Sequence, residues 1–182
     1  IMKSEPQLIV TTKELNAALA KLSDAEFVAI DTEFMRETTY YPKLCLVQLS
    51  AVGKTICIDP LAPNLDLSPL YGLMQNPSII KVFHAGRQDL EIFVHLTGQV
   101  PIPIYDTQIA AMVCGLGDQV GYDRLVQHYT GQTIDKSSRF TNWMERPLTK
   151  RQIKYAADDV IYLAEIYPRM LAHLKDTNRT HW

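Results

Sequence analysis

The sequence lacks a long apolar run and has little cysteine. No stretch approaches the ~20 apolar residues of a membrane-spanning helix, and the segment IMKSEPQ has no apolar signal-peptide core. The three cysteines, Cys45, Cys57 and Cys114, occur singly, with no CxxC or His-Cys pattern, so the sequence indicates neither a zinc motif nor a disulfide framework. We therefore expect a cytoplasmic protein with no membrane partner and no disulfide partner.

The sequence also has no excess of positive charge. Its 18 Lys and Arg residues and 20 Asp and Glu residues give a formal net charge of -2. This balance argues against a protein that coats nucleic acid non-specifically, although a local site could still bind phosphates. A chain of 182 residues with 47% hydrophobic content can form one domain with a substantial core. We expect a single domain over residues 1–182, and a monomer.

The first half of the sequence predicts a helix and then three successive strands. Thr11 or Thr12 can cap a short helix with apolar residues at helical spacing. Apolar runs then predict strands at residues 27–34, 44–50 and 55–59. Gly53 lies between the second and third strands and suits a hairpin turn. The sheet is therefore expected to begin with antiparallel strands.

The second half alternates strands with helices. The sequence predicts helices at residues 65–74, 86–96, 108–116, 122–131 and 149–174, and strands at residues 78–85 and 102–107. Parallel strands joined by helices fit this alternation. We therefore predict an α/β fold with a mixed sheet of about five strands, the first three antiparallel and the rest parallel.

The first predicted strand ends in two acids. In FVAIDTEFM, Asp31 and Glu33 are two residues apart, so both carboxylates lie on one face of the strand, where like charges repel. The pair could be a structural pair satisfied by neighbours, a surface pair at the end of the strand, or half of a divalent-metal site. For the pair alone, a structural role is the commoner outcome.

A metal site needs further acids from separate segments, and the sequence contains candidates. Asp89 falls in the first turns of the helix in VFHAGRQDLEIF, where it could also simply favour the helix dipole. In YAADDVIYL, Tyr155 and Asp159 are four residues apart and share one helix face. Alternatively, this helix buries half of its tyrosine and exposes its acids to solvent.

The three segments together carry a family resemblance. DTEF, HAGRQDLEIF and YAADDVIYL, in this order, resemble the three motifs of the DEDD superfamily of 3′→5′ exonucleases, in the version with a tyrosine in the third motif (DEDDy). The segment DKSSRFTNWMERPLTKRQIKYAADD resembles the catalytic domain of the ribonuclease D family. The resemblance covers residue 27 to about residue 171 and implies an RNase H-like fold. The family's C-terminal helical (HRDC-type) domains have no counterpart in this sequence.

The resemblance also implies the catalytic residues. By this resemblance, two divalent cations, Mg²⁺ or Mn²⁺, would be bound by four carboxylates, those of Asp31, Glu33, Asp89 and Asp159. Asp159 is chosen over Asp158 because the family spacing is Y-x-x-x-D. Tyr155 would orient the attacking water, because a phenol with a pKa of ~10 is a poor base at neutral pH. Shared metal ions would also explain how Asp31 and Glu33 remain side by side.

Residues near the motifs are candidates for substrate contact. Phe34 and Met35 could stack against terminal bases or pack at the strand end, and His84 could face a phosphate or cap its turn. Five basic residues precede or begin the last helix and could contact phosphates or be solvated: Lys136, Arg139, Arg146, Lys150 and Arg151. Trp143 and Gln48 are expected in the core, and Asp106 is expected to cap the helix that follows it.

The implied function is a two-metal-ion 3′→5′ exoribonuclease. It would release 5′-mononucleotides from RNA 3′ ends, such as those of tRNA precursors or other structured RNA. A 3′→5′ exonuclease acting on single-stranded DNA is the alternative, because only a contact to the 2′-hydroxyl separates the two. A catalytically inactive RNA-binding module is a third reading. The presence of all four acids and the tyrosine counts against it.

Overall fold

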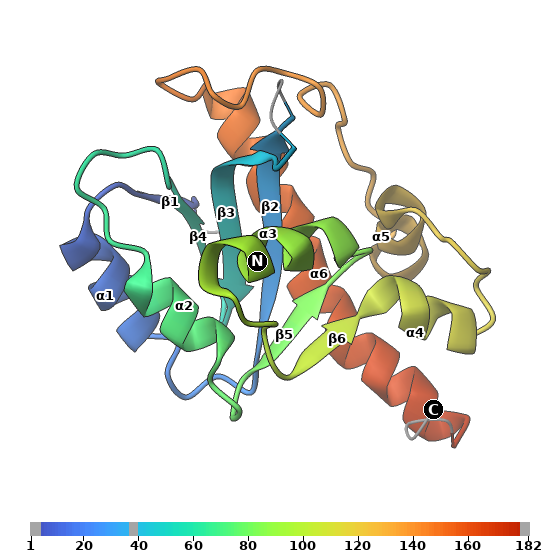
Figure 1. Cartoon of the computed structure of the whole chain (residues 1–182). Helices are drawn as coiled ribbons and strands as arrows, with labels where there is room; N and C mark the ends of the chain where they lie inside the picture. Colours follow the sequence, from blue (N-terminus) through green and yellow to red (C-terminus); the bar gives the residue numbers. More distant parts are fainter. Residues whose placement is uncertain (1–4, 37–39, 179–182) are drawn as a thin grey trace.

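A computed structural model describes residues 5–36 and 40–178 of the chain. Its centre is a six-stranded sheet with the strand order β1-β4-β3-β2-β5-β6 (Figure 1). The strands are β1 (Gln7–Ile9), β2 (Phe27–Met35), β3 (Lys43–Ala51), β4 (Lys54–Ile58), β5 (Ile80–Phe83) and β6 (Ile104–Asp106). The strand that carries the acid pair, β2, therefore lies in the interior of the sheet, between β3 and β5.

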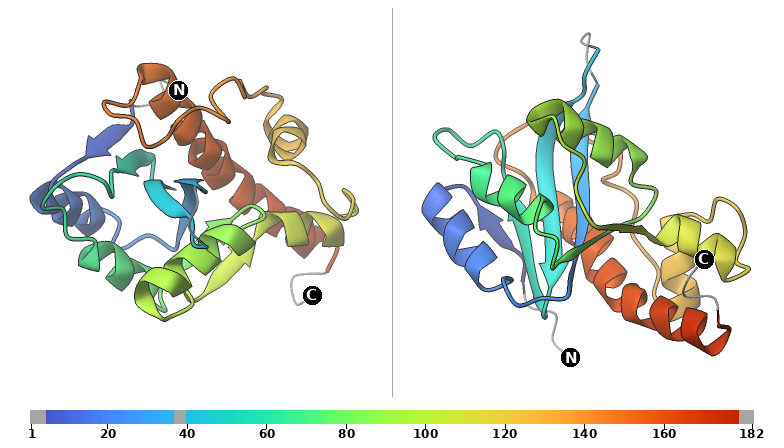
Figure 2. Two further views of the ribbon diagram at one scale, coloured as in Figure 1. Left: turned by 45° about the horizontal axis from the view of Figure 1, so that its top comes forward. Right: turned by 60° about the horizontal axis from the view of Figure 1, so that its bottom comes forward.

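Helices cover both faces of this sheet (Figure 2). They are α1 (Thr12–Ala20), α2 (Ser68–Met74), α3 (Arg87–Thr97), α4 (Thr107–Val113), α5 (Tyr122–Thr130) and α6 (Lys150–Asp176). Helices α1, α2 and α3 pack on one face, and the long helix α6 crosses the other. Helices α4 and α5 pack beside α6. Within the described residues, no helix combines the length and the apolar character that crossing a bilayer requires.

The predicted strand directions are confirmed. Strand β3 pairs antiparallel with both β2 and β4, whereas β5 pairs parallel with β2 and with β6. The sheet has one strand more than the sequence predicted, because β1 pairs parallel with β4. A strand of three residues is too short to show a period of two in the sequence. Only its pairing with β4 in the structure identifies β1 as a strand.

The helix ends follow local capping chemistry. Thr11 caps α1, and its hydroxyl and the Glu14 side chain form a reciprocal capping box. Helix α5 ends at Gly131, whose φ of 71° lies in the left-handed region that glycine adopts without strain. Thr149 caps α6 with a second capping box. Helix α2 begins at Ser68, later than predicted, and Asp66 accepts a hydrogen bond from the Ser68 amide.

The alternation of side chains along β2 decides where its acids point. Val28 and Ile30 lie in the core cluster shared with α1, α2 and α3, whereas Ala29 packs in the cluster on the α6 side. With a period of two, Asp31 and Glu33 continue the α6 side and Thr32 continues the α3 side. The buried strand thus presents carboxylates to one helix and a hydroxyl to another.

Candidate active site

Three carboxylates meet between β2 and α6. Asp31 and Glu33 of β2 and Asp159 of α6 each offer an oxygen, and these oxygens all lie within 4.8 Å of one another. All three side chains are half-buried. The sequence pattern placed the first two on one strand face, and the fold brings the third to that face from 126 residues further along the chain than Glu33.

The electrostatics of this cluster are unfavourable to the charged form. Burial, followed by the charges of Asp159 and Asp89, raises the pKa of Asp31 well above its ordinary value. Burial and the neighbouring carboxylates likewise raise the pKa of Glu33 and of Asp159. Among the described residues, none of the ion pairs within 4.0 Å involves these three acids. A cation would relieve this repulsion.

The donor set fits a hard divalent cation. Mg²⁺ and Mn²⁺ bind carboxylate oxygens in proteins. Here half-buried carboxylates from two separate chain segments supply such oxygens. Gln48 of β3, opposite Asp31 in the strand register, donates a hydrogen bond from Nε2 to Glu33 Oε1 at 3.3 Å. This contact orients one carboxylate toward the cluster. The acidic cluster is therefore a candidate site for a divalent metal ion.

The fourth predicted acid, Asp89, lies on the other side of β2. It is in the first turn of α3, is 7% exposed, and accepts a hydrogen bond from the hydroxyl of Thr32. Burial raises its pKa to about 6, and the Thr32 hydrogen bond opposes that rise. Asp89 is outside the cluster of three found among the described residues. Its charge nevertheless raises the pKa of both Asp31 and Glu33.

The turn before α3 is fixed by Asp106. As predicted, this carboxylate caps α4, accepting from the Gln108 amide at 2.9 Å. It also accepts from the amides of Ala85 and Gly86, each at 2.9 Å. Ala85 has a φ of 52°, and a Cβ at Gly86 would lie 2.6 Å from the Phe83 Cβ. The tight turn thus requires glycine at position 86 and places the start of α3, and so Asp89, beside β2.

Tyr155 lies one turn before Asp159 on α6 and lines a pocket with it. The pocket has a volume of about 250 Å³ and is also lined by Asp31, His84 and Tyr122. Burial and then the charges of Asp159, Glu33 and Asp31 raise the pKa of Tyr155 above its ordinary value. The phenol therefore remains protonated at neutral pH and can donate a hydrogen bond into the pocket.

The predicted substrate residues occupy different environments. Both ring nitrogens of His84 have partners at 2.9 Å, the Thr107 hydroxyl and the Val120 carbonyl, although the ring also lines the pocket. Burial lowers the pKa of His84, which keeps the ring neutral. Phe34 packs against the core on the α3 side and Met35 against the cluster that contains Trp143. Both remain partly exposed at the end of β2.

Asp158, the acid next to Asp159, and the basic residues before and at the start of α6 have different contacts. Asp158 accepts from Lys154 Nζ at 2.9 Å and does not join the cluster that contains Asp159. Lys136 and Arg139 line the pocket, and Lys136 also pairs with Asp123 at 2.8 Å. Lys150 and Arg151 are exposed at the start of α6.

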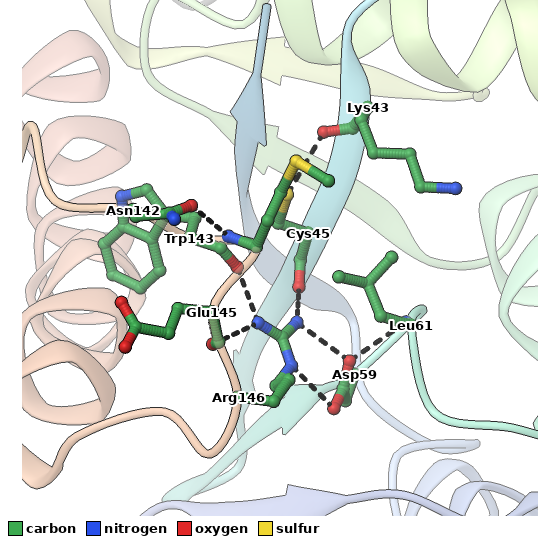
Figure 3. Close-up of polar contacts among 9 residues, drawn as sticks. Lys43, Cys45, Asp59, Leu61, Asn142, Trp143, Glu145 and Arg146 are labelled. Atoms are coloured by element: carbon green, nitrogen blue, oxygen red, sulfur yellow. Dashed lines mark hydrogen bonds and ion pairs between the residues drawn. The ribbon is translucent and has the colours of Figure 1, made fainter. Parts of the chain in front are cut away.

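Arg146 has neither of the roles expected for it, because its guanidinium binds the protein itself (Figure 3). It forms a bidentate pair with Asp59, through Nε at 3.0 Å and Nη2 at 2.9 Å. It also donates to the carbonyls of Cys45, Trp143 and Glu145. Trp143 is 2% exposed, in agreement with its expected packing role. This arrangement fastens the segment before α6 to strand β3 and to Asp59, the residue that follows β4.

Three contributors to the site were not expected from the sequence as such. Thr32 holds Asp89, Gln48 holds Glu33, and Tyr122 donates its hydroxyl to the Asp158 carbonyl at 2.8 Å while lining the pocket. The alternation around Asp31 and Glu33 could have placed Thr32 on the opposite face. Pairing of Gln48 with the acid strand depends on sheet register, which the sequence alone does not display.

A mixed sheet with an acid pair on an interior strand, completed by an acid and a tyrosine one helical turn apart, defines the RNase H-like class of metal-dependent nucleases. Comparison with known proteins agrees with this class. The chain belongs to the 3′-5′ exonuclease family, which it matches over residues 6–175.

Curated relatives of the chain carry the name Ribonuclease D. The protein of Bartonella henselae is 51% identical over 176 residues, which cover 97% of this chain and 43% of the relative. That of Jannaschia sp. is 53% identical over 181 residues, covering 97% and 47%. The chain therefore spans about half the length of the curated relatives it matches.

Solved structures agree in fold. The crystal structure of Escherichia coli RNase D, described as an exoribonuclease involved in structured RNA processing, matches with a TM-score of 0.92 and 40% identity, over 96% of this chain and 46% of that one. Brucella melitensis NrnC bound to pGG matches with a TM-score of 0.77 and 31% identity, over 88% and 79%. NrnC with bound Mg²⁺ matches with a TM-score of 0.77 and 28% identity, over 97% and 83%.

Proposed function

We propose that the chain is a divalent-metal-dependent 3′→5′ exoribonuclease that releases 5′-mononucleotides. The observation that carries the proposal is the convergence of Asp31, Glu33 and Asp159 within 4.8 Å of one another, beside Tyr155 in a pocket of about 250 Å³. Membership of the 3′-5′ exonuclease family supports it. The pocket volume suits one terminal nucleotide rather than a duplex.

Four carboxylates would hold two Mg²⁺ or Mn²⁺ ions: Asp31, Glu33 and Asp159 directly, and Asp89 from the α3 side of β2. Bound there, the ions would supply an acidified water and neutralise charge on the scissile phosphate and the departing 3′ oxygen. The binding of Mg²⁺ by NrnC, a relative of similar fold, supports this assignment. The protein's part is to keep the carboxylates deprotonated and oriented, for which Gln48 and Thr32 supply hydrogen bonds.

Tyr155 orients the attacking water. Its raised pKa makes it a hydrogen-bond donor and not a base at neutral pH. Its position one helical turn from Asp159 places the phenol beside the carboxylates rather than among them. By holding the water in line with the phosphorus, Tyr155 would raise the rate of hydrolysis through positioning alone.

Exposed cations and a neutral ring would receive the substrate. Lys136 and Arg139 line the same pocket as the acids and can contact the phosphates of the terminal nucleotides. His84 is fixed by two hydrogen bonds and lines the pocket wall, where it limits the space for the terminal nucleotide. Phe34 and Met35, partly exposed at the end of β2, can contact the terminal base.

RNA is the proposed substrate because the relatives that cover nearly all of this chain are ribonucleases D. The Escherichia coli relative is described as acting in structured RNA processing, so 3′ trimming of tRNA precursors or similar RNA fits this chain. Single-stranded DNA is the alternative substrate. The presence of Asp31, Glu33, Asp89, Asp159 and Tyr155 argues against an inactive binding module.

The test is the hydrolysis of a single-stranded RNA and its DNA counterpart with identical base sequence, in Mg²⁺, in Mn²⁺ and in EDTA, with products separated by chromatography. We expect 5′-mononucleotides from RNA with either metal and none in EDTA, with RNA cut faster than DNA. Faster cleavage of DNA would assign the alternative substrate. Binding of RNA without any hydrolysis would favour the binding module.

A further inference from the structure

A second hollow lies on the opposite side of β2, between helix α3 and the described residues that follow this strand, 36 and 40–42. It has a volume of about 1000 Å³, and the residues that line it include Arg36, Tyr40, Tyr41, Arg87, Glu91 and His95. We call this surface the Tyr40 groove. Its size, aromatic rings and guanidinium groups distinguish it from the small acidic pocket on the α6 side.

Three aromatic rings of the Tyr40 groove contact one another in a row. Tyr41 stacks on His95 of α3, with ring centroids 3.7 Å apart and an interplanar angle of 13°. Tyr40 stands edge-on to Tyr41, with centroids 5.0 Å apart and planes at 86°. Tyr40 is 86% exposed and Tyr41 51% exposed. The stack on His95 of α3 thus fixes the Tyr41 ring, whereas the Tyr40 ring is exposed to solvent.

The charged groups of the groove are mainly positive. Arg36 and Arg87 are both exposed, and the Arg87 side chain is 91% exposed. Arg36 donates to the Tyr40 carbonyl at 3.5 Å, which holds its guanidinium near the rings. Glu91 pairs with Arg87 Nε at 3.3 Å, so an anion bound here would share the Arg87 guanidinium with that carboxylate.

The groove continues from the two elements that carry catalytic acids. Arg36 follows β2 directly and lies three residues beyond Glu33, a distance of about 10 Å along an extended chain. Arg87 lies two residues before Asp89, in the first turn of α3. An RNA strand whose 3′ end reaches the acids would therefore have its preceding nucleotides within reach of the groove.

We propose that the Tyr40 groove binds the single-stranded RNA that precedes the 3′-terminal nucleotide. A base stacks on the exposed ring of Tyr40, which the stacked pair of Tyr41 and His95 supports, and phosphates contact Arg36 and Arg87. Exposed aromatic rings beside cations are the recurring solution for binding single strands without sequence preference. The proposal rests on the proposed exonuclease function and adds a binding site for the body of the substrate.

The test separates binding in the groove from chemistry in the acidic pocket. Rates are measured on a dinucleotide, which has a single nucleotide before its 3′-terminal one and so too little chain to follow the groove, and on a ten-nucleotide RNA. Affinity for the longer RNA is measured by fluorescence anisotropy in EDTA. Tyr40→Ala removes the ring, and Tyr40→Phe keeps it. Arg36→Ala with Arg87→Ala removes the cations. Arg169→Ala is the control for the loss of an (i, i+4) ion pair outside the groove, because Arg169 pairs with Glu165 on α6 and also donates to the Tyr129 carbonyl.

We expect Tyr40→Ala to lower the ratio of kcat/KM for the ten-nucleotide RNA to that for the dinucleotide about tenfold, and Tyr40→Phe to preserve it. The double arginine variant should weaken binding and reduce the slope of log affinity against log salt by about 0.7 for each lost phosphate contact. Glu91→Gln should tighten binding, because it removes the competing carboxylate. Arg169→Ala should change none of these quantities.

Each failure has a separate meaning. If the unaltered chain cuts both RNAs and the groove variants match it in ratio, affinity and salt slope, the groove proposal is wrong and the exonuclease function stands. If the chain cuts neither RNA, the proposed function fails. The anisotropy measurements still decide the groove in that case, since unaltered affinity in Tyr40→Ala and in the double arginine variant would overturn it.

Discussion

The hydroxyl of Thr32 donates a hydrogen bond to the carboxylate of Asp89 and so joins strand β2 to helix α3 at the level of the acidic cluster. Thr32 lies between Asp31 and Glu33 and points to the opposite face of the strand. Two acids and the hydroxyl that holds a third are therefore set by three consecutive residues. The bond also counters the rise in the pKa of Asp89 that burial causes.

Thr32→Val should therefore impair the site without changing the shape of the side chain. The variant removes a donor from a buried carboxylate, a loss of about 1–3 kcal/mol, and raises the pKa of Asp89 further. We expect at least a tenfold loss of RNA hydrolysis and a higher Mg²⁺ concentration for half-maximal rate, measured by titrating the metal. Thr32→Ser keeps the donor and should retain most of the activity. Equal activity of the valine and serine variants would contradict the role of this bond.

Asp31→Asn should stabilise the metal-free protein while abolishing its activity. The substitution removes one buried charge from a cluster in which repulsion and burial already raise the pKa values. We expect a gain of ~0.5–2 kcal/mol in the free energy of unfolding, measured by urea denaturation in EDTA. Added Mg²⁺ should raise the Tm of the unaltered chain and not that of the variant. A destabilised variant would show that Asp31 has a structural partner.

The stabilising effect of Asp31→Asn should grow with pH. The folded pKa of Asp31 is raised, so its contribution to stability is fully present below the unfolded value of ~3.9 and is lost as the pH rises through the folded value. We expect little difference between variant and parent in EDTA at pH 4 and a larger one at pH 8. Because the half-buried His84 has a lowered pKa and so the opposite dependence, the comparison must use the difference between the two proteins. A constant difference would contradict the raised pKa.

Arg146→Ala should cost stability rather than substrate affinity. The guanidinium is bound to Asp59 and to three backbone carbonyls, and its removal leaves the mostly buried Asp59 carboxylate without this partner. We expect a loss of about 2–4 kcal/mol in urea denaturation. Arg151→Ala, at an exposed position, should stay within about 0.5 kcal/mol. If Arg146→Ala raised KM at unchanged stability, a phosphate contact would be the better account.

Periodicity and capping signals predicted most of the fold. Apolar runs and a turn glycine predicted the acid strand and the two strands after it, and a capping threonine with helical spacing predicted the long helix after Thr149; all are present in the structure. The short strand β1 was not predicted, because its three residues pair only once β4 is in place. Local pattern also placed Tyr155 and Asp159 on one face of α6, and the fold brings Asp159 to the acids of β2.

The side chains that support the site depend on tertiary contacts. Gln48 reaches Glu33 only because of the register between β2 and β3. Arg146 finds Asp59 across 87 residues of sequence, so the basic character of its segment suggested phosphate binding where the structure has an internal pair. Asp106 was expected only as a helix cap, and its second task of holding the turn at Ala85 and Gly86 required the folded neighbours.

The most direct test of the central claim is a cleavage assay on 5′-labelled single-stranded RNA in Mg²⁺, with the unaltered chain beside Asp159→Asn and with EDTA added to a parallel reaction. The account predicts a ladder that shortens one nucleotide at a time from the 3′ end, present only with the unaltered chain and metal. A ladder of unchanged rate in Asp159→Asn, or in EDTA, would contradict the assignment of the acidic cluster as the metal-dependent catalytic site.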